Sequence, residues 1–157
     1  MSRIWLVDGR SGSGKTVLAD ALAAELGGVV VHMDDLYPGW DGLAAGSAYA
    51  FERILAPLAR GQEALWRRWD WAAGARAEEH RLPAGSALVL EGCGALSRAS
   101  APLAERTIWL ECDEATRRAR ALARDGVDDW WERWRAQEDA FYAREGSRAL
   151  ATERRGC

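Results

Sequence analysis

Eight consecutive residues near the start of the chain have the composition of a phosphate-binding loop. Residues 9–16 read Gly-Arg-Ser-Gly-Ser-Gly-Lys-Thr and satisfy the pattern G-x-x-x-x-G-K-[ST] in full. Glycines let such a loop turn several backbone N–H groups toward one phosphate chain, and a following helix adds its positive N-terminal end. Lys15 would reach the β- and γ-phosphates, and the Thr16 hydroxyl would ligate Mg²⁺. The predicted nucleotide-binding residues are Gly9, Arg10, Ser11, Gly12, Ser13, Gly14, Lys15 and Thr16.

Other sequence features narrow the chemistry of this loop. Lys15 is the only lysine among 21 basic residues, so the Asn-Lys-x-Asp motif that reads guanine does not occur. Val17 stands where a dinucleotide-binding fingerprint has its third glycine. The chain also has no hydrophobic run ending in Asp-Glu, which ATPase motors carry. Transfer of a phosphoryl group to a small molecule is the chemistry that remains.

Carboxylates follow two apolar runs and could serve this transfer. Asp34 and Asp35 come after the run 29–33, and Glu91 ends the run 87–91. In an open α/β sheet, ligands bind outside the carboxyl ends of the strands, so we expect these carboxylates to face the γ-phosphate. Aspartates also open turns, and Asp34 and Asp35 could do so before Pro38. Glu91 could instead be a solvated or capping residue.

Three arginines supply the positive charge that phosphoryl transfer needs. At 100° per residue, Arg117, Arg120 and Arg124 fall within about 60° of one another on the predicted helix 114–124. An arginine binds two phosphate oxygens with its planar fork and stays ionised. The alternative is a solvated helix face with ordinary surface ion pairs.

The elements that must position these residues follow from hydrophobic periodicity. We expect β-strands at 4–7, 29–33, 87–91 and 107–111, helices at 15–26, from Ser47 to about Pro57, at 114–124 and at 130–145, and an irregular segment or hairpin at 63–82. An Asp129-x-x-Glu132 capping pattern opens the last helix, and its Trp130, Trp134 and Phe141 would pack on the sheet. The alternation of strands and helices predicts parallel strands with helices on both faces.

The chain resembles the uridine kinase family of P-loop nucleoside and metabolite kinases, from about Ser2 to Tyr142. The family's D-x-[FL]-Y element is matched by Asp34-Asp35-Leu36-Tyr37, and its strand-E-G element by Leu90-Glu91-Gly92. The resemblance implies a three-layer P-loop NTPase sandwich with strand order 2-3-1-4. It also implies that Asp34 is the base for the acceptor hydroxyl, with Asp35 the less favoured choice, and that Glu91 and Asp34 join Thr16 around Mg²⁺.

The same resemblance extends to the lid and the substrate side. Residues 113–126 are similar to the kinase lid, whose arginines close over the phosphates. Residues 66–71 resemble the aromatic-Asp segment with which uridine kinases hold sugar and base, and a tryptophan among Trp40, Trp69 and Trp71 could stack on a planar substrate. The alternative role for these tryptophans is core or cover. The implied substrate residues are Asp35, Tyr37, Trp40, Arg68, Asp70 and Trp71.

Composition sets the remaining expectations. A length of 157 residues predicts one domain over 1–157, with a core at about 2–145 and a tail at 146–157. A net charge of −3 and the lack of a long apolar run do not favour nucleic acid or membrane as partners, and we expect a cytoplasmic protein that could form a homodimer. Three cysteines without CxxC spacing argue against a disulfide framework and a zinc site and are expected to be buried or incidental thiols. The tail has no apolar run, so either the sheet has four strands or the native chain is longer or altered there.

The sequence as a whole predicts an ATP- and Mg²⁺-dependent kinase. It would transfer the γ-phosphate to a hydroxyl of a nucleoside, similar to uridine or cytidine, or of a related metabolite. A kinase for a nucleoside monophosphate, a sugar acid or an antibiotic is the alternative within enzymes, and Arg53, Arg67 and Arg68 would suit a phosphorylated acceptor. A non-catalytic nucleotide-binding module is the alternative outside them.

Overall fold

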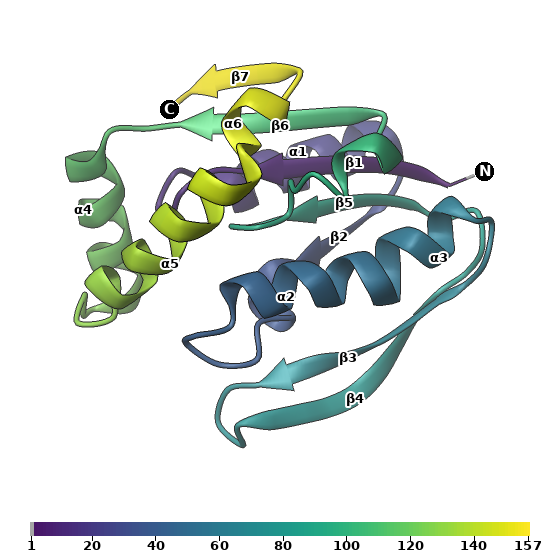
Figure 1. Ribbon diagram of the computed structural model, residues 1–157, viewed down its shortest axis with the longest axis horizontal. Helices are drawn as coiled ribbons and strands as arrows, with labels where there is room; N and C mark the ends of the chain where they lie inside the picture. The colour runs from purple at the N-terminus through teal and green to yellow at the C-terminus, as the bar shows by residue number, and fades with distance from the viewer. Residues whose placement is uncertain (1) are drawn as a thin grey trace.

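A five-stranded parallel sheet forms the centre of the computed structural model, which describes residues 2–157 (Figure 1). The strands are β1 (Arg3–Asp8), β2 (Val29–His32), β5 (Ala87–Glu91), β6 (Arg106–Glu111) and β7 (Glu153–Gly156). They lie in the order β2-β5-β1-β6-β7, and each neighbouring pair is parallel. The four strands expected from the apolar runs are confirmed in the expected order.

Helices cover both faces of this sheet, because the strand side chains are apolar on both sides. Helix α1 (Lys15–Leu26) packs Leu22 against Val7 and Val89 on one face. On the other face, Leu6 and Leu90 belong to the larger core, to which most of the remaining helices contribute. Those helices are α2 (Leu43–Ala50), the π-helical turn Phe51–Leu55, α3 (Ala56–Ala59), α5 (Trp131–Glu145) and α6 (Ser147–Leu150). Helix α4 (Glu114–Asp125) contributes no residue to this core. Single-turn 3₁₀ helices lie at Met33–Asp35 and Ala101–Leu103.

Two helix starts differ from the sequence-based expectation. Helix α2 begins at Leu43, so Ser47 lies inside it, where its buried hydroxyl donates to the carbonyl of Gly94 at 2.7 Å. Helix α5 begins at Trp131 without a side-chain cap, and the expected capping residue Glu132 pairs instead with Arg118 at 3.4 Å. In both places a tertiary contact holds the side chain that the sequence had assigned to the start of the helix.

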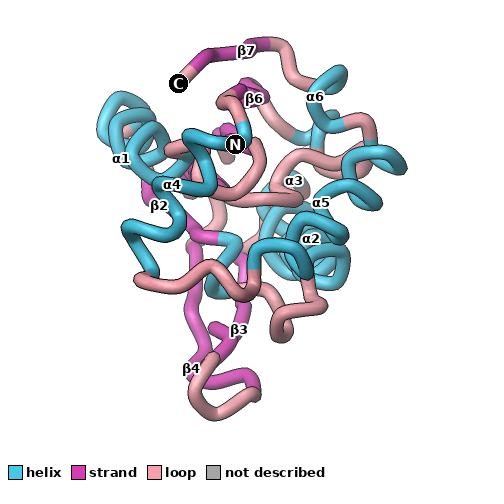
Figure 2. The backbone as a smooth tube through the Cα atoms, turned by 90° about the vertical axis from the view of Figure 1, so that its left-hand side faces the viewer, coloured by secondary structure: helices cyan, strands magenta, loops and turns pink. Residues whose placement is uncertain are grey.

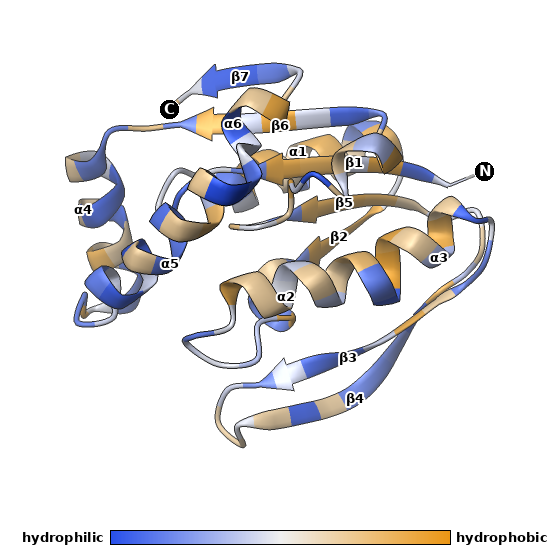
Figure 3. Cartoon of the chain, viewed as in Figure 1, coloured by the Kyte–Doolittle hydropathy of each residue, from blue (hydrophilic) through white to orange (hydrophobic). Residues whose placement is uncertain are grey.

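The tail corrects two expectations at once. Its residues Glu153–Gly156 form β7, the fifth strand, which pairs with β6 at the sheet edge. The strand is polar (Figure 3) and lies at the edge of the sheet. The Arg106 guanidinium donates two hydrogen bonds of 2.8 Å to the Glu153 carboxylate. Beyond it, Cys157 forms a disulfide with Cys112, so these two cysteines are not the incidental thiols that were expected.

The segment 63–82, for which a hairpin and an irregular segment were both left open, forms a hairpin. Strands β3 (Ala64–Asp70) and β4 (Ala75–Leu82) are antiparallel and make a separate two-stranded sheet. Figure 2 shows the hairpin extending away from the helices, and its turn brings Trp71 beside the end of β2. No helix among residues 2–157 is long and apolar enough to cross a membrane.

Candidate active site

The loop between β1 and α1 has the backbone that a phosphate cradle requires. Gly12 and Gly14 have φ of +81° and +93°, a region that side chains disfavour. Gly12 also leaves no room for a Cβ, which would lie 2.2 Å from the carbonyl oxygen of Arg117. The Lys15 ammonium donates to the carbonyl of Arg10 at 2.9 Å and lies 3.4 Å from the Ser13 hydroxyl. Because an ammonium has three donors, one N–H remains for a ligand.

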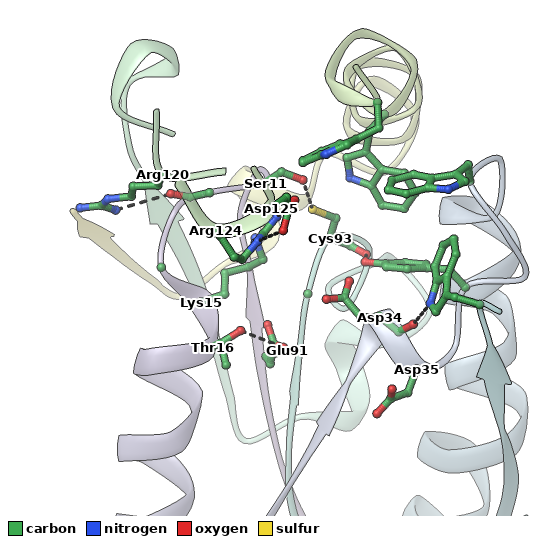
Figure 4. A pocket seen from close by; sticks show the side chains of 18 of the residues that line it. Ser11, Lys15, Thr16, Asp34, Asp35, Glu91, Cys93, Arg120, Arg124 and Asp125 are labelled. Carbon is green, nitrogen blue, oxygen red and sulfur yellow. Dashed lines mark hydrogen bonds and ion pairs between the residues drawn. The ribbon is translucent and has the colours of Figure 1, made fainter. Parts of the chain in front are cut away.

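A cavity of about 770 Å³ opens directly above this loop. Figure 4 shows Lys15, Thr16, Asp34 and Glu91 facing it from three different elements. Of the predicted nucleotide-binding residues, Ser11, Gly12, Gly14, Lys15 and Thr16 line this cavity. Ser13 lines a second cavity of about 600 Å³ on the other side of the loop, and the predicted residues Gly9 and Arg10 line neither of the two cavities.

The ends of α1, β2 and β5 bring three polar side chains into contact. The Thr16 hydroxyl donates to Glu91 Oε1 at 3.3 Å, and His32 Nδ1 lies 2.6 Å from the same oxygen. The bond to Glu91 raises the pKa of His32. Hydroxyl and carboxylate oxygens are ligands that Mg²⁺ accepts, and Mg²⁺ also keeps several waters. Thr16 and Glu91 therefore fit a magnesium ion, although nowhere in residues 2–157 do three His, Cys, Asp or Glu side chains gather around one metal position.

Asp34 lines the cavity at the end of β2, with Asp35 next to it. Asp34 is exposed to the cavity, but the protein around it removes part of its water. This desolvation raises the pKa of Asp34 and the Glu91 carboxylate raises it further, whereas Lys15 and Arg124 act in the opposite direction. The backbone carbonyl of Asp34 accepts a hydrogen bond of 2.9 Å from the Trp71 indole, so the hairpin turn fixes this segment. A carboxyl group that faces a cavity and has a raised pKa is a candidate general base.

Four tryptophans from three segments make one aromatic wall, which we define as Trp40, Trp71, Trp130 and Trp134. The ring of Trp40 lies 5.1 Å from that of Trp71, 5.7 Å from that of Trp130 and 6.4 Å from that of Trp134. All four line the cavity. Trp40 and Trp71 were predicted for the substrate side. Trp134 packs in the core as expected but also reaches the cavity with Trp130, a role that helix periodicity alone could not reveal.

Only two of the three predicted lid arginines face the cavity. Arg120 and Arg124 line the cavity from α4. Arg117 lies outside it: it is buried, donates to the carbonyl of Cys112 at 2.9 Å and contacts the carbonyl of Ser11 at 3.4 Å. Its guanidinium attaches α4 to the phosphate loop, which corrects the expectation that it reaches outward.

Two predicted substrate residues instead make hydrogen bonds within the β3–β4 hairpin. Arg68 is paired with Glu78 of β4 through bonds of 2.9–3.1 Å. Asp70 accepts from the amides of Ala72 and Ala73, which closes the hairpin turn. Neither residue lines the cavity, because the hairpin's own strand pairing occupies them. Tyr37 does line it, with its hydroxyl bound to the carbonyl of Cys93 at 2.6 Å.

A buried polar layer beneath the loop was not predicted. Asp8 accepts hydrogen bonds from the amides of Gly9, Gly94 and Leu96 and from the Tyr142 hydroxyl at 2.7–3.1 Å. Burial outweighs these bonds and raises the pKa of Asp8 to about 6.

Glu138 of α5 lies in the same layer and accepts from the Ser11 amide at 2.7 Å. Cys93 is buried, in agreement with one of the two roles expected for the cysteines, and it lines the cavity. Burial raises the pKa of its thiol to about 12, so it is not a reactive thiolate.

Solved structures of kinases share this fold. A possible uridine kinase from Bacillus stearothermophilus aligns with a TM-score of 0.70 at 17% identity, over 98% of this chain and 88% of that one. A gluconokinase from Sinorhizobium meliloti gives 0.55 at 18% identity over 98% and 81%, and a shikimate kinase from Acinetobacter baumannii in complex with shikimate gives 0.56 at 16% identity over 97% and 81%. No family model and no curated protein matches the sequence. The chain thus has the α/β fold of P-loop kinases.

Proposed function

We propose that this protein is a kinase that transfers the γ-phosphate of ATP to a hydroxyl group of an uncharged small molecule, such as a nucleoside or a related metabolite. One observation carries the proposal. Five residues of the phosphate loop, a hydroxyl–carboxylate pair suited to Mg²⁺ and a carboxyl group with a raised pKa all face a single cavity. The cytoplasm, where ATP is abundant, is the expected site of action.

The donor would lie across the phosphate loop. The two cavities share Gly14, Val17 and Arg120, so a triphosphate held by the loop can extend from one cavity into the other. Its nucleoside would occupy the smaller cavity, and its γ-phosphate the larger one. Lys15 and the loop amides would bind phosphate oxygens, and Thr16 and Glu91 would hold Mg²⁺, which neutralises charge on the phosphates when bound.

The acceptor would lie between Asp34 and the aromatic wall. Asp34 can accept the hydroxyl proton as the oxygen attacks phosphorus, and its raised pKa brings it closer to the pH at which a base works best. Arg124 lines the same cavity, where it can stabilise charge on the transferred phosphoryl group. The loop, Asp34 and the wall together would place the reacting atoms in line, which is a large part of catalysis in this reaction class.

The charges on the acceptor side favour a substrate without a phosphate or carboxylate. Arg124 is already paired with Asp125 at 2.8 Å. Arg53, Arg67 and Arg68, which would suit a phosphorylated acceptor, do not line the cavity. Asp34, Asp35 and the aromatic wall offer hydrogen-bond acceptors and flat apolar surface instead. These contacts favour a neutral alcohol over a nucleoside monophosphate or a sugar acid.

A release assay tests this proposal. Purified protein with ATP and Mg²⁺ is screened for ADP release against nucleosides, nucleoside monophosphates, neutral sugars and sugar acids, with the Lys15→Ala variant as control. We expect release with neutral acceptors in the wild type and none above background in the variant. ATP-induced thermal stabilisation without turnover of any acceptor would instead favour a non-catalytic nucleotide-binding module.

A further inference from the structure

The disulfide between Cys112 and Cys157 joins two segments that are 45 residues apart in sequence. Cys112 follows β6, and Cys157 follows β7, with the Cys157 amide bound to the carbonyl of Glu111 at 2.9 Å. Cys157 is exposed and Cys112 is half-buried, so a small reductant can reach the bond. Cys93, the third cysteine, is buried at 4% exposure and stays apart from this pair.

One end of the disulfide forms part of a wall of the smaller cavity. Arg155, Gly156 and Cys157 line this cavity opposite Ser13 and Gly14 of the phosphate loop. Arg155 and Gly156 carry no apolar side chain that could hold them on the core. Their position therefore depends on strand pairing with β6 and on the covalent bond to Cys112.

The other end of the disulfide lies at the joint between α4 and the phosphate loop. The carbonyl of Cys112 accepts from Arg117, whose guanidinium also contacts the carbonyl of Ser11. Arg120 Nη1 lies 3.8 Å from the Cys112 sulfur and 3.5 Å from the carbonyl oxygen of Gly12. Because Arg120 lines both cavities, a movement of Cys112 would move a cation that faces the proposed nucleotide path.

We propose that Cys112 and Cys157 form a reversible redox site that sets the affinity of the protein for its nucleotide. In the disulfide form, residues 155–157 and Arg120 are held beside the loop. Reduction releases both segments and weakens nucleotide binding. Solvent-exposed disulfides are among those that thiol exchange opens most readily, and Cys157 is exposed. This inference rests on the proposed function, because it takes the smaller cavity to hold the nucleoside of ATP.

The reductant is a dithiol, and the exchange balances. One thiolate of the dithiol attacks a sulfur of the Cys112–Cys157 bond and forms a mixed disulfide, releasing one cysteine as a thiolate that takes up a proton. The second thiol of the reductant then displaces the other cysteine. Two electrons and two protons pass to the cysteines, and the reductant leaves as a cyclic disulfide.

Calorimetric titration with Mg²⁺ and an ATP analogue that cannot transfer its γ-phosphate tests the inference. The full chain is measured in its oxidised form and after dithiothreitol, with circular dichroism to monitor folding and maleimide labelling to count reactive thiols. We expect reduction to expose two thiols and to raise the Kd at least fivefold in a folded protein. The Cys112→Ser and Cys157→Ser variants should bind like the reduced form. In the double variant, dithiothreitol should change nothing.

The outcomes separate this inference from the proposed function. Equal or tighter binding by the reduced chain overturns the redox site and leaves the kinase proposal intact. Loss of binding that accompanies global unfolding also overturns it, because the proposed change is local. If neither form binds the analogue, the proposed function itself is wrong, and the redox inference fails with it.

Discussion

Replacing Asp34 by asparagine removes the proposed proton acceptor while keeping the shape of the side chain. The hydrogen bond from Trp71 reaches the backbone carbonyl of residue 34, so it survives the substitution. Asp34 also lies outside the phosphate loop, so the contacts of Lys15 with Arg10 and Ser13 are untouched. We therefore expect ATP to bind within about twofold of the wild type, which is about 0.4 kcal/mol.

Transfer, by contrast, should fall by at least about 100-fold, because general acid–base catalysis contributes about 10²–10⁴-fold. A 100-fold loss corresponds to about 2.7 kcal/mol of transition-state stabilisation. The pH profile should change as well. Desolvation at the cavity wall and the Glu91 carboxylate raise the pKa of Asp34 above 3.8. Because the base acts only when ionised, wild-type transfer should increase as the pH rises through that pKa. The variant should lack this limb.

Steady-state kinetics of ADP release at saturating ATP, over a range of pH, measure both effects. Asp35→Asn is the matched control, since this neighbour lines the same cavity. Figure 4 shows the Asp34 side chain on the side of the cavity that holds Lys15 and Glu91. The transfer rate of the control variant should fall by less than about 10-fold, which corresponds to about 1.4 kcal/mol of transition-state stabilisation. Wild-type transfer by Asp34→Asn would refute the reasoning, and a larger loss in Asp35→Asn would reassign the base.

Three further predictions concern the lid, the disulfide and the buried layer. Arg124→Ala should lower kcat at least about 10-fold with little change in stability. Arg117→Ala should instead lower the free energy of unfolding by about 1.5–3 kcal/mol, because its charged hydrogen bonds are buried. Denaturant unfolding and steady-state kinetics of both variants test this, and the reverse pattern of effects would contradict it. Reduction of the Cys112–Cys157 bond should lower the free energy of unfolding by up to about 4 kcal/mol, the chain-entropy value for a loop of this length, and an unchanged urea midpoint would count against it. The pKa of Asp8 is raised from 3.8 to about 6, so its contribution to stability, about 3 kcal/mol, should be present below pH 4 and lost as the pH rises through about 6; a carbon NMR titration of its carboxyl group should have its midpoint near 6, not below 4.

The parts of the fold that local patterns encode could be predicted from the sequence. The phosphate loop lies where its motif indicated, between β1 and α1, because its glycines and Lys15 act within eight consecutive residues. The four apolar runs also form strands as expected, because local hydrophobicity marks each of them, whereas their order came from the family resemblance. The hairpin at 63–82 follows from its alternation of residue types.

Features that depend on distant contacts could not be predicted in this way. β7 is polar, and its partner Arg106 lies 47 residues away from Glu153. Cys112 lies 45 residues away from Cys157, which follows the strand. The capping pattern Asp129-x-x-Glu132 did not form, because α5 begins at Trp131 and Glu132 pairs with the distant Arg118. Spacing on the helix placed Arg117 with Arg120, but spacing contains no information about the carbonyl groups that hold it.

The substrate side shows the same division. Trp40 and Trp71 were expected there, and they line the cavity. Arg68 and Asp70 were expected beside them, yet Glu78 and the hairpin turn occupy both side chains. A resemblance between short segments predicts which residue types occur there. It does not predict the partners of each side chain, which depend on the rest of the hairpin.

Phosphorus NMR of a mixture of the protein, Mg²⁺, ATP and a neutral acceptor from the release screen tests the central claim most directly. The account predicts that the γ-phosphate signal of ATP is replaced by that of a phosphomonoester, with ADP formed in equal amount, and that Lys15→Ala abolishes the change. Release of inorganic phosphate alone, or no consumption of ATP with any class of alcohol, would contradict it.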